Sequence, residues 1–302
     1  MKQKNIKVAI TGVNGFVGSW LKKELEDHGY DVYGTDITGE DGRNLLDENS
    51  FKEWIETIKP DICYHLAAQV GRLFGERDVV HTVRHNAEMT TIVAKHCGDM
   101  GIRLAYVSTS EAYGDQGEHI CDEYGELKLP HNLYGLTKRW GEEAAQLFAP
   151  NNLVIARLSM PYGPGVPPGK GRRAMDTMLW QAYHNMPMTV HIGAERSWCW
   201  IGDTVRALRM IIEHPKSGIY NIGRDDDPRP MSDIAKIACK LSNRTEDLIQ
   251  MIPAPSMQTV VKRLSTDRIR SLGWSPMVEL EEGILHVHEW IKRFDVNSVE
   301  HP

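Results

Sequence analysis

The sequence predicts an α/β fold in which a doubly wound parallel sheet with helices on both faces is joined to a smaller C-terminal lobe. Short β-branched runs alternate with amphipathic stretches along the first half of the chain. That order requires crossover connections and therefore parallel strands. A glycine-rich turn follows the first of these runs, at residues 11–18. Near Met160 the pattern changes, because residues 161–172 hold more Pro and Gly than a strand or helix tolerates.

The individual elements follow from hydrophobic periodicity. Strands are expected at residues 6–10, 31–35, 61–66, 103–108, 153–158 and 218–223. Apolar residues at helical spacing predict helices from Val17 to Leu25, Phe51 to Ile58, about Tyr134 to Phe148, and Leu280 to Phe294. Pro60 ends the second of these helices.

Composition excludes several classes of protein. The 302 residues are 41% hydrophobic and 25% charged, as in an ordinary globular chain. A net charge of −6 without a basic run argues against binding to nucleic acid. The five cysteines are scattered along the chain, at Cys63, Cys97, Cys121, Cys199 and Cys239. This pattern indicates reduced thiols of a cytoplasmic protein and predicts no zinc or other metal site. We expect no signal peptide and no membrane partner, since no apolar run approaches the ~18–20 residues of a membrane span.

The turn Thr11-Gly-Val-Asn-Gly-Phe-Val-Gly18 joins a strand to a helix. Such a turn lets backbone amides at the helix N-terminus face a pyrophosphate. Asp36 lies 18 residues after Gly18, where a carboxylate holds a ribose 2′-hydroxyl and repels a 2′-phosphate. A tight turn with an unrelated loop Asp is the alternative. We therefore expect an NAD-binding domain at residues 1–162 and a substrate-binding lobe at residues 163–302, with the chain returning to the first domain at about 198–223.

Tyr134 and Lys138 lie four residues apart on one predicted helix face. An ammonium group near a phenol favours the phenolate, so the tyrosine could act as a base. On its own, this spacing of Tyr and Lys usually belongs to a solvent-exposed helix face. The preceding strand, however, ends in Ser108-Thr-Ser-Glu111, and hydroxyls at the carboxyl end of a parallel strand lie where open α/β sheets bind ligands.

Taken together, the motifs resemble those of the extended short-chain dehydrogenase/reductases, specifically the NAD-dependent epimerase/dehydratase family, whose fold is Rossmann-type. The resemblance spans nearly the whole chain. It rests on the glycine turn, Asp36, Tyr134 and Lys138, and on five further segments: His65-Leu-Ala-Ala68, Ser108-Thr-Ser-Glu-Ala-Tyr-Gly114, Tyr162-Gly-Pro164, Tyr220-Asn-Ile-Gly223 and Leu272-Gly-Trp-Ser-Pro276. Met160 stands where family members usually carry Asn.

The resemblance implies roles for particular residues. Tyr134 would remove the proton from a sugar hydroxyl, usually at C4, while NAD takes the hydride. Lys138 would lower the tyrosine pKa and hold the nicotinamide ribose, and Thr109 would hydrogen-bond the same sugar hydroxyl. The residues expected to bind NAD are Gly12, Gly15, Phe16, Val17, Gly18, Asp36, Leu66, Ala67, Ala68, Ser108, Tyr134 and Lys138.

Ser110 and Glu111 bear on the net reaction. The Thr-Ser-Glu triplet looks like that of GDP-mannose 4,6-dehydratases and UDP-glucuronate decarboxylases, and a carboxylate beside the sugar could abstract the C5 proton. Glu111 could instead cap or salt-bridge a loop. Dehydration or epimerisation after C4 oxidation is our leading hypothesis. Decarboxylation, or net dehydrogenase or 4-keto reductase activity, remains open. A non-catalytic NAD-binding protein is least expected, because Tyr134 and Lys138 are both present.

The remaining expectations concern partners. By resemblance, Arg196 and Arg263 clamp the diphosphate of a nucleotide-diphosphate sugar, since guanidinium forks suit phosphate oxygens. The family also implies a homodimer through helices around 80–97 and 134–148. His81 and His85 have a spacing that can hold a metal, but solvated side chains are favoured. An exposed turn is likewise favoured over a cation site at Asp225–Asp227.

Overall fold

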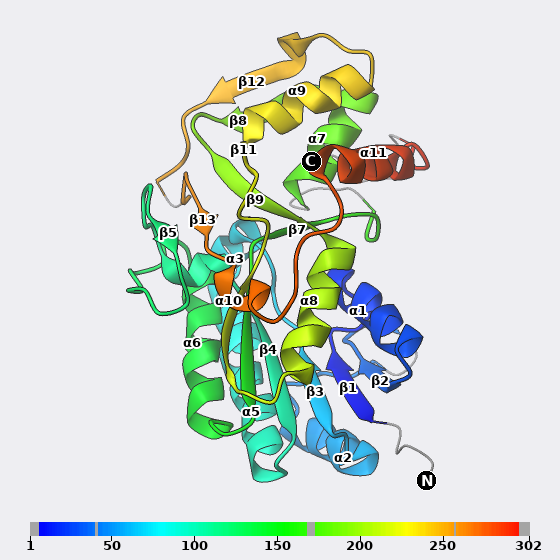
Figure 1. Ribbon diagram of the computed structural model, residues 1–302, viewed down its shortest axis with the longest axis vertical. Coiled ribbons are helices and arrows are strands. Elements are labelled where there is room, and N and C mark those ends of the chain that lie inside the picture. The colour runs from blue at the N-terminus through cyan, green and yellow to red at the C-terminus, as the bar shows by residue number, and fades with distance from the viewer. Residues whose placement is uncertain (1–5, 40–41, 168–172, 257, 296–302) are drawn as a thin grey trace.

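A six-stranded, wholly parallel sheet forms the centre of the computed structural model (Figure 1), which describes residues 6–39, 42–167, 173–256 and 258–295. The strand order is β10-β6-β4-β3-β1-β2. The strands are β1 (Lys7–Thr11), β2 (Asp31–Thr35), β3 (Ile62–His65), β4 (Arg103–Thr109), β6 (Leu153–Leu158) and β10 (Gly218–Ile222). All six predicted strands are present within one residue of their expected bounds, and the doubly wound α/β class is confirmed.

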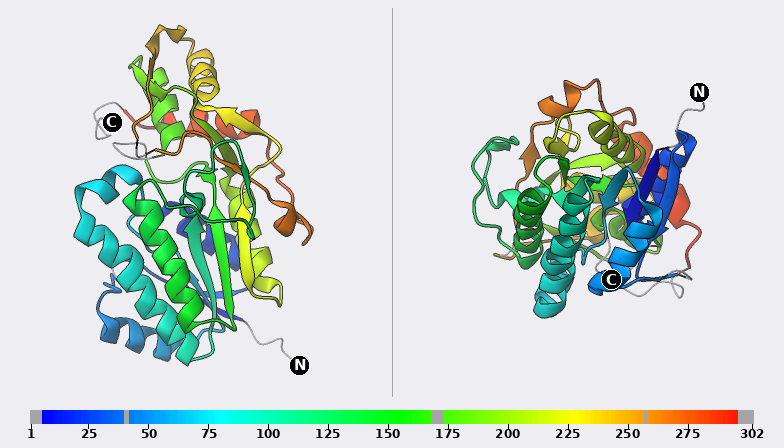
Figure 2. Two further views of the ribbon diagram at one scale, coloured as in Figure 1. Left: turned by 90° about the vertical axis from the view of Figure 1, so that its left-hand side faces the viewer. Right: turned by 90° about the horizontal axis from the view of Figure 1, so that it is seen from below.

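Helices cover both faces of this sheet. α1 (Phe16–Asp27) and α8 (Ile201–Glu213) pack on one face, and α2 (Glu48–Ile58), α5 (Met89–Asp99) and α6 (Leu133–Phe148) pack on the other (Figure 2). Side chains alternate between these layers: Val8 and Ile10 enter the core beneath α1, and Ala9 enters the core on the other face. Burial on both faces explains why the strands read as continuous apolar runs.

The strand order fixes the position of the ligand crevice. From β1 the chain moves to β2 on one side and then to β3 on the other, so the direction of winding reverses beside β1. In open α/β sheets a crevice forms at this reversal, outside the carboxyl ends of the strands. Thr11 and His65 end the two strands that flank it.

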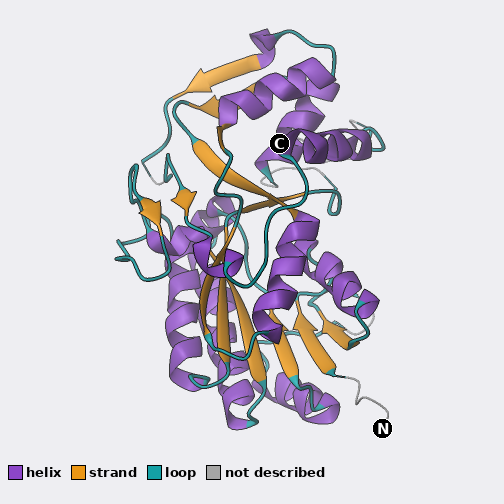
Figure 3. Cartoon of the chain, viewed as in Figure 1, coloured by secondary structure: helices purple, strands orange, loops and turns teal. Residues whose placement is uncertain are grey.

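The C-terminal lobe has a core of its own. Its three-stranded sheet has the order β11-β9-β7, from β11 (Pro228–Pro230), β9 (Glu195–Trp200) and β7 (Met160–Tyr162). Helices α7 (Ala174–Tyr183), α9 (Met231–Leu241) and α11 (Leu280–Ile291) enclose the core, which includes Trp180 and Trp198. A parallel pair, β8 (Met188–His191) and β12 (Ile249–Ile252), lies at the far end from the main sheet (Figure 3).

The chain crosses between the lobes repeatedly. After β9 it returns to the first lobe as α8 and β10. A second return, which the sequence did not suggest, brings α10 (Asp267–Arg270) and the buried Trp274 into the core of the main sheet. In addition, β5 (Ile120–Cys121) pairs with β13 (Arg263–Leu264), joining segments from the two halves of the chain. These elements are too short to produce a recognisable periodicity.

Two further observations concern the chain as a whole. All five cysteines are buried and free. Among the helices within the described ranges, none combines the length and apolar character needed to cross a membrane.

Candidate active site

The glycine turn brings the N-terminus of α1 close to the end of β3. A Cβ at Gly12, whose φ is +75°, would lie 2.6 Å from the backbone nitrogen of Ala67. A Cβ at Gly18 would lie 2.1 Å from the Gly12 carbonyl oxygen, and one at Gly15 would lie 3.2 Å from the same atom. Gly15 begins the helix without a side-chain cap. The first-turn amides, which include those of Phe16 and Val17, are therefore available to an anionic ligand.

Asp36 follows β2 and lies beside this turn. Its carboxylate accepts a hydrogen bond from the backbone N–H of Asn14 at 3.0 Å, within the glycine turn itself. The Asn14 side chain donates to the carbonyl of Thr38 at 2.8 Å. The turn and the loop after β2 therefore form one unit, with the Asp36 carboxylate at the edge of the predicted cofactor crevice.

A directional chain of hydrogen bonds organises the segment after β3. The Ala67 N–H donates to Thr11 Oγ1 (3.3 Å), which lies 2.7 Å from His65 Nδ1. On the other side of the ring, His65 Nε2 lies 3.1 Å from Thr90 Oγ1, which donates to the Asn86 carbonyl at 2.6 Å. These partners require a neutral imidazole protonated at Nε2. Burial, with a contribution from the charge of Lys138, lowers the pKa of His65 to about 3.

Asn86 connects this segment to the helix that carries Tyr134. It lies in a π-helical turn, η1 (Arg84–Glu88), between α4 (Val79–Val83) and α5. Its side chain accepts from the Gln69 N–H at 2.8 Å and donates to the Gln69 carbonyl at 3.0 Å. It also donates to Thr137 Oγ1 at 3.0 Å, one residue before Lys138. The segment of Leu66, Ala67 and Ala68, which is predicted to line the cofactor, is thereby held in register with α6.

Tyr134 and Thr109 meet at the carboxyl end of β4. The Thr109 hydroxyl lies close enough to Tyr134 to affect its pKa, and it also caps the short helix η2 (Ser110–Tyr113) by accepting from the Glu111 N–H at 3.2 Å. Burial raises the pKa of Tyr134 to about 12, against the opposing effect of the Thr109 hydroxyl, and the charge of Glu111 adds to the increase. The expected lowering of this pKa by Lys138 is therefore not present in the protein alone.

Lys138 lies in a buried position and forms no ion pair with any of the residues that the structure describes. Its side chain is 2% exposed, and Nζ lies 4.3 Å from the centre of the Tyr106 ring. Burial lowers the pKa of Lys138 to about 7, despite the favourable charge of Glu142. Among the described residues, no acceptor forms a hydrogen bond to Nζ. A buried ammonium with free donors fits a hydroxyl-rich ligand such as a ribose.

Ser108 differs from its neighbour Thr109. Its hydroxyl donates to Glu142 at 2.5 Å, and the same carboxylate accepts from Arg157 Nη2 at 2.6 Å and from Nε at 3.0 Å. The Glu142 and Arg157 side chains are each 2% exposed. The Ser108 hydroxyl is thus part of a buried ion-pair network between β4, α6 and β6. Toward a cofactor, the Ser108 hydroxyl could therefore act only as an acceptor.

Glu111 lies between the N-terminus of α6 and the C-terminal lobe. One carboxylate oxygen accepts from the Asn132 side chain at 3.2 Å, and the other forms an ion pair with Lys262. Asn132 also caps α6 by accepting from the Gly135 N–H at 2.9 Å. A Cβ at Gly135 would lie 2.9 Å from the Glu111 carbonyl oxygen, so glycine is needed for this approach. Ser110, the other member of the triplet, is buried at the start of η2.

Arg196 and Arg263, the two residues predicted to bind the diphosphate, already interact with other protein groups. Arg196 is 7% exposed, and its guanidinium donates to the carbonyls of Glu195, Val260 and Thr259 at 2.7 Å each. Arg263 pairs with Glu195 at 2.6 Å and with Glu118 at 2.9 Å on a more exposed surface. Arg196 therefore has a clear structural role, and only Arg263 could exchange its partners at modest cost.

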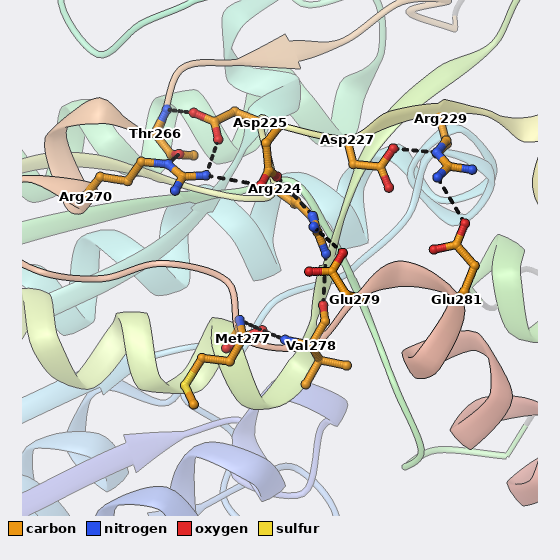
Figure 4. A network of polar contacts seen from close by, with 12 residues as sticks. Arg224, Asp225, Asp227, Arg229, Thr266, Arg270, Met277, Val278, Glu279 and Glu281 are labelled. Atoms are coloured by element: carbon orange, nitrogen blue, oxygen red, sulfur yellow. Dashed lines mark hydrogen bonds and ion pairs between the residues drawn. The ribbon is translucent and has the colours of Figure 1, made fainter.

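The features considered as metal sites are occupied by other interactions. His81 and His85 stack on each other, with ring centres 3.8 Å apart. The aspartates of the Asp225–Asp227 turn pair with arginines, as Figure 4 shows: Asp225 with Arg270 at 2.6 Å and Asp227 with Arg229. Within the described ranges, no group of three or more His, Cys, Asp or Glu side chains could hold a metal ion.

Sequence reasoning missed four residues that shape this site: Asn86, Asn132, Glu142 and Lys262. A capping signal was available for Asn132, because Asn immediately before a helix is a preferred N-cap. No local pattern marks the other three, since their partners lie 15 or more residues away in sequence.

The fold and the site together define a class of protein. A doubly wound parallel sheet, a glycine turn and a Thr-Tyr-Lys set at the carboxyl ends of the strands are the features of a short-chain dehydrogenase/reductase. The close-packed turn fits a dinucleotide, and so does the buried Lys138 amine, which has no hydrogen-bond acceptor among the described residues.

Comparison with known proteins identifies the family. The model of the NAD dependent epimerase/dehydratase family matches residues 8–223, and the chain belongs to that family. UDP-glucuronic acid decarboxylase 5 of Arabidopsis thaliana is 26% identical, over 93% of this chain and 88% of the relative. The dTDP-D-glucose 4,6-dehydratase of Mus musculus is 27% identical, over 83% of this chain and 73% of the relative. The fold matches a UDP-glucose 4-epimerase complex with NAD from Thermus thermophilus, with a TM-score of 0.85, 21% identity and coverage of 95% and 99%.

Proposed function

We propose that this chain oxidises the C4 hydroxyl of a nucleotide-diphosphate sugar with bound NAD and then eliminates water from the 4-keto sugar. The observation that carries the proposal is the position of the Glu111 carboxylate, on the turn that follows Thr109 and close enough for its charge to affect the pKa of Tyr134. The two relatives described above are named for UDP-glucuronic acid and dTDP-D-glucose, which are both nucleotide sugars.

The cofactor would be held by the residues around the switch in strand order. The amides after Gly15 would face the pyrophosphate, and Asp36 would hold the adenosine ribose. Lys138 would donate to the nicotinamide ribose, because its Nζ has no hydrogen-bond acceptor within the described part of the chain. When bound, NAD supplies the acceptor for the C4 hydride and later returns that hydride to the sugar.

Tyr134 would remove the C4 hydroxyl proton. Its pKa of about 12 in the protein alone makes it a poor base at neutral pH, so the reaction needs added positive charge near the phenol. Protonated Lys138 and a cationic nicotinamide ring would both supply charge of that sign. The Thr109 hydroxyl, close to the Tyr134 phenol, would orient the same sugar hydroxyl.

Glu111 would then act on the oxidised sugar. A ketone at C4 acidifies the C5 proton, and an ionised carboxylate can accept that proton. Burial alone would raise the pKa of Glu111, but Lys262, Arg196 and Asn132 together hold it below the ordinary value. Glu111 is therefore ionised at neutral pH, as a base must be. The C5–C6 double bond forms as the C6 hydroxyl leaves, and the proton that Glu111 took from C5 goes with it, so that water is lost.

Decarboxylation of a nucleotide uronic acid is the second candidate. It needs the same C4 oxidation, after which the C6 carboxylate leaves as carbon dioxide. The decarboxylase relative, aligned over 93% of this chain, supports it. The diphosphate contact falls to Arg263 in either reaction, because the Arg196 guanidinium is occupied.

A panel of nucleotide sugars incubated with NAD and the protein, read by mass spectrometry, tests these proposals. Loss of water supports dehydration, and loss of carbon dioxide supports decarboxylation. An unchanged mass with altered sugar stereochemistry indicates epimerisation, and loss or gain of two hydrogens with net change in NADH indicates a dehydrogenase or reductase. Glu111→Gln should stop after C4 oxidation and accumulate NADH. Normal turnover by this variant would refute the assigned role of Glu111.

We further infer a cytoplasmic homodimer. The five free thiols support a reducing compartment. Trp140 and Leu147, seven residues apart on α6, and Val80 on α4 expose apolar side chains on the helices expected at the interface. Leu147→Glu should convert a dimer into a monomer in light scattering, and a monomeric wild type would contradict the inference.

A further inference from the structure

Lys262 reaches the candidate active site from the opposite lobe. We propose that Lys262 is a positioning residue that holds the Glu111 carboxylate against the N-terminus of the Tyr134 helix. The inference rests on the proposed function only in that Glu111 takes part in the chemistry. The role of Lys262 toward Glu111 can be measured without turnover.

The ion pair is more buried than an ordinary surface salt bridge. The Lys262 side chain is 3% exposed, and that of Glu111 is 22% exposed. Asn132 donates to the second carboxylate oxygen at 3.2 Å, so Glu111 is held from two directions. Removing one partner of a buried pair leaves the other charge without compensation, which makes the remaining geometry unstable.

The backbone around Lys262 is fixed on both sides. Before it, Val261 forms a β-bridge with Glu195, and Arg196 donates to the carbonyls of Thr259 and Val260 at 2.7 Å each. After it, β13 pairs with β5. Alternation along this extended segment directs Arg263 toward Glu195 and Lys262 toward Glu111. Arg196 thus supports the segment that presents the lysine.

The charges around the pair explain why Glu111 stays ionised. Glu111 is faced by Lys262, Arg196, Asn132 and Tyr134, and the Lys262 ammonium also lies near Cys121. Burial lowers the pKa of Lys262, and Arg196 lowers it further, whereas Glu111 opposes both. The two groups therefore stabilise each other's charged forms in a region that otherwise disfavours charge.

This arrangement makes the reacting groups of the first lobe depend on the second lobe. Thr109, Tyr134 and Lys138 come from the first lobe, whereas the orientation and charge of Glu111 depend on a residue from the second. The site is complete only when the segment 259–264 is packed against β9 and β5.

Lys262→Met tests the proposal, with Lys262→Arg as the conservative variant and Lys236→Met as the matched control. Lys236 is an exposed lysine of the same lobe, 4.0 Å from Asp233. Lys262→Met should lower kcat by about tenfold or more with a smaller change in KM, and should move the acid limb of the pH–rate profile to higher pH. Lys262→Arg should restore the acid limb, and Lys236→Met should match the wild type.

A second measurement does not depend on activity. Labelling of the glutamate carboxyl carbon makes the titration of each glutamate visible by NMR, and the Glu111 resonance is the one that is absent from Glu111→Gln. Its titration midpoint should move to higher pH in Lys262→Met but not in Lys236→Met. An unchanged midpoint would overturn the proposal. The proposal would also fail if the two substitutions acted independently. In that case the loss of kcat in the Glu111→Gln, Lys262→Met double variant would equal the product of the losses in the single variants. Lys262→Gln replaces Lys262→Met if the latter does not fold. If no nucleotide sugar reacts with the wild type, the proposed function fails and the titration still decides the role of Lys262.

Discussion

Acidification should destabilise this protein through His65. The imidazole accepts at Nδ1 from Thr11 and donates at Nε2 to Thr90, so the folded state requires the neutral ring. Its pKa is about 3 in the folded protein, against an ordinary value of 6.5. A group whose pKa is lowered by folding contributes stability that is fully present above the unfolded value. That stability is lost as the pH falls from 6.5 through 3.

The magnitude follows from the two pKa values. At about pH 5 an unfolded chain binds nearly one proton at this histidine, and the folded protein binds almost none. Since pH 5 lies about 1.5 units below 6.5, and each unit corresponds to about 1.4 kcal/mol, the loss between pH 7.5 and pH 5 is about 2 kcal/mol.

Urea unfolding at the two pH values measures this loss. Other groups also titrate, so the informative quantity is the difference between wild type and His65→Asn, which keeps an acceptor for Thr11 and has no imidazole. The wild type should lose about 2 kcal/mol more than this variant. His119→Asn, at an exposed loop histidine, should behave as the wild type. Parallel losses in wild type and His65→Asn would refute the assignment of a buried neutral imidazole.

Three further substitutions test the site and its support. Gly18→Ala places a Cβ 2.1 Å from the Gly12 carbonyl oxygen, which as a backbone atom cannot move aside. Calorimetry should therefore show NAD affinity reduced at least about tenfold and stability reduced by about 1–3 kcal/mol. Unchanged affinity would contradict the assigned role of the turn. Glu142→Gln leaves Arg157 buried without its anion and should cost about 3–5 kcal/mol in urea unfolding; a loss below about 1 kcal/mol would show that the pair is solvated. Tyr134→Phe should reduce kcat about 10²–10⁴-fold and leave NAD binding within about threefold, and retained turnover would exclude Tyr134 as the base.

The main sheet and the glycine turn could be predicted because their signals are local. β2 and β6 begin and end at the expected residues, and the turn from Gly12 to Gly18 carries its own spacing. Both depend on neighbouring residues in sequence, which periodicity and turn chemistry report directly.

The support around the reacting groups could not be predicted in the same way. Glu111 meets Lys262 across 151 positions (262 − 111), and Arg157 meets Glu142 between a strand and a helix. The same limit explains Arg196: its residue type suits a phosphate, but tertiary packing gives its guanidinium three carbonyl acceptors. The raised pKa of Tyr134 is a further example, because spacing from Lys138 contains no information about burial.

The repeated crossing of the chain between lobes limits how this protein can be recombined. A chimera that kept residues 1–162 and took the remainder from a relative would import foreign α8, β10, α10 and Trp274 into the core of the main sheet. It would also pair its own β5 with a foreign β13, immediately after the position of Lys262. Exchange of a contiguous cassette therefore disturbs the sheet and the active site together. New specificities in this scaffold are better sought by substitutions in the loops of the C-terminal lobe than by shuffling its halves.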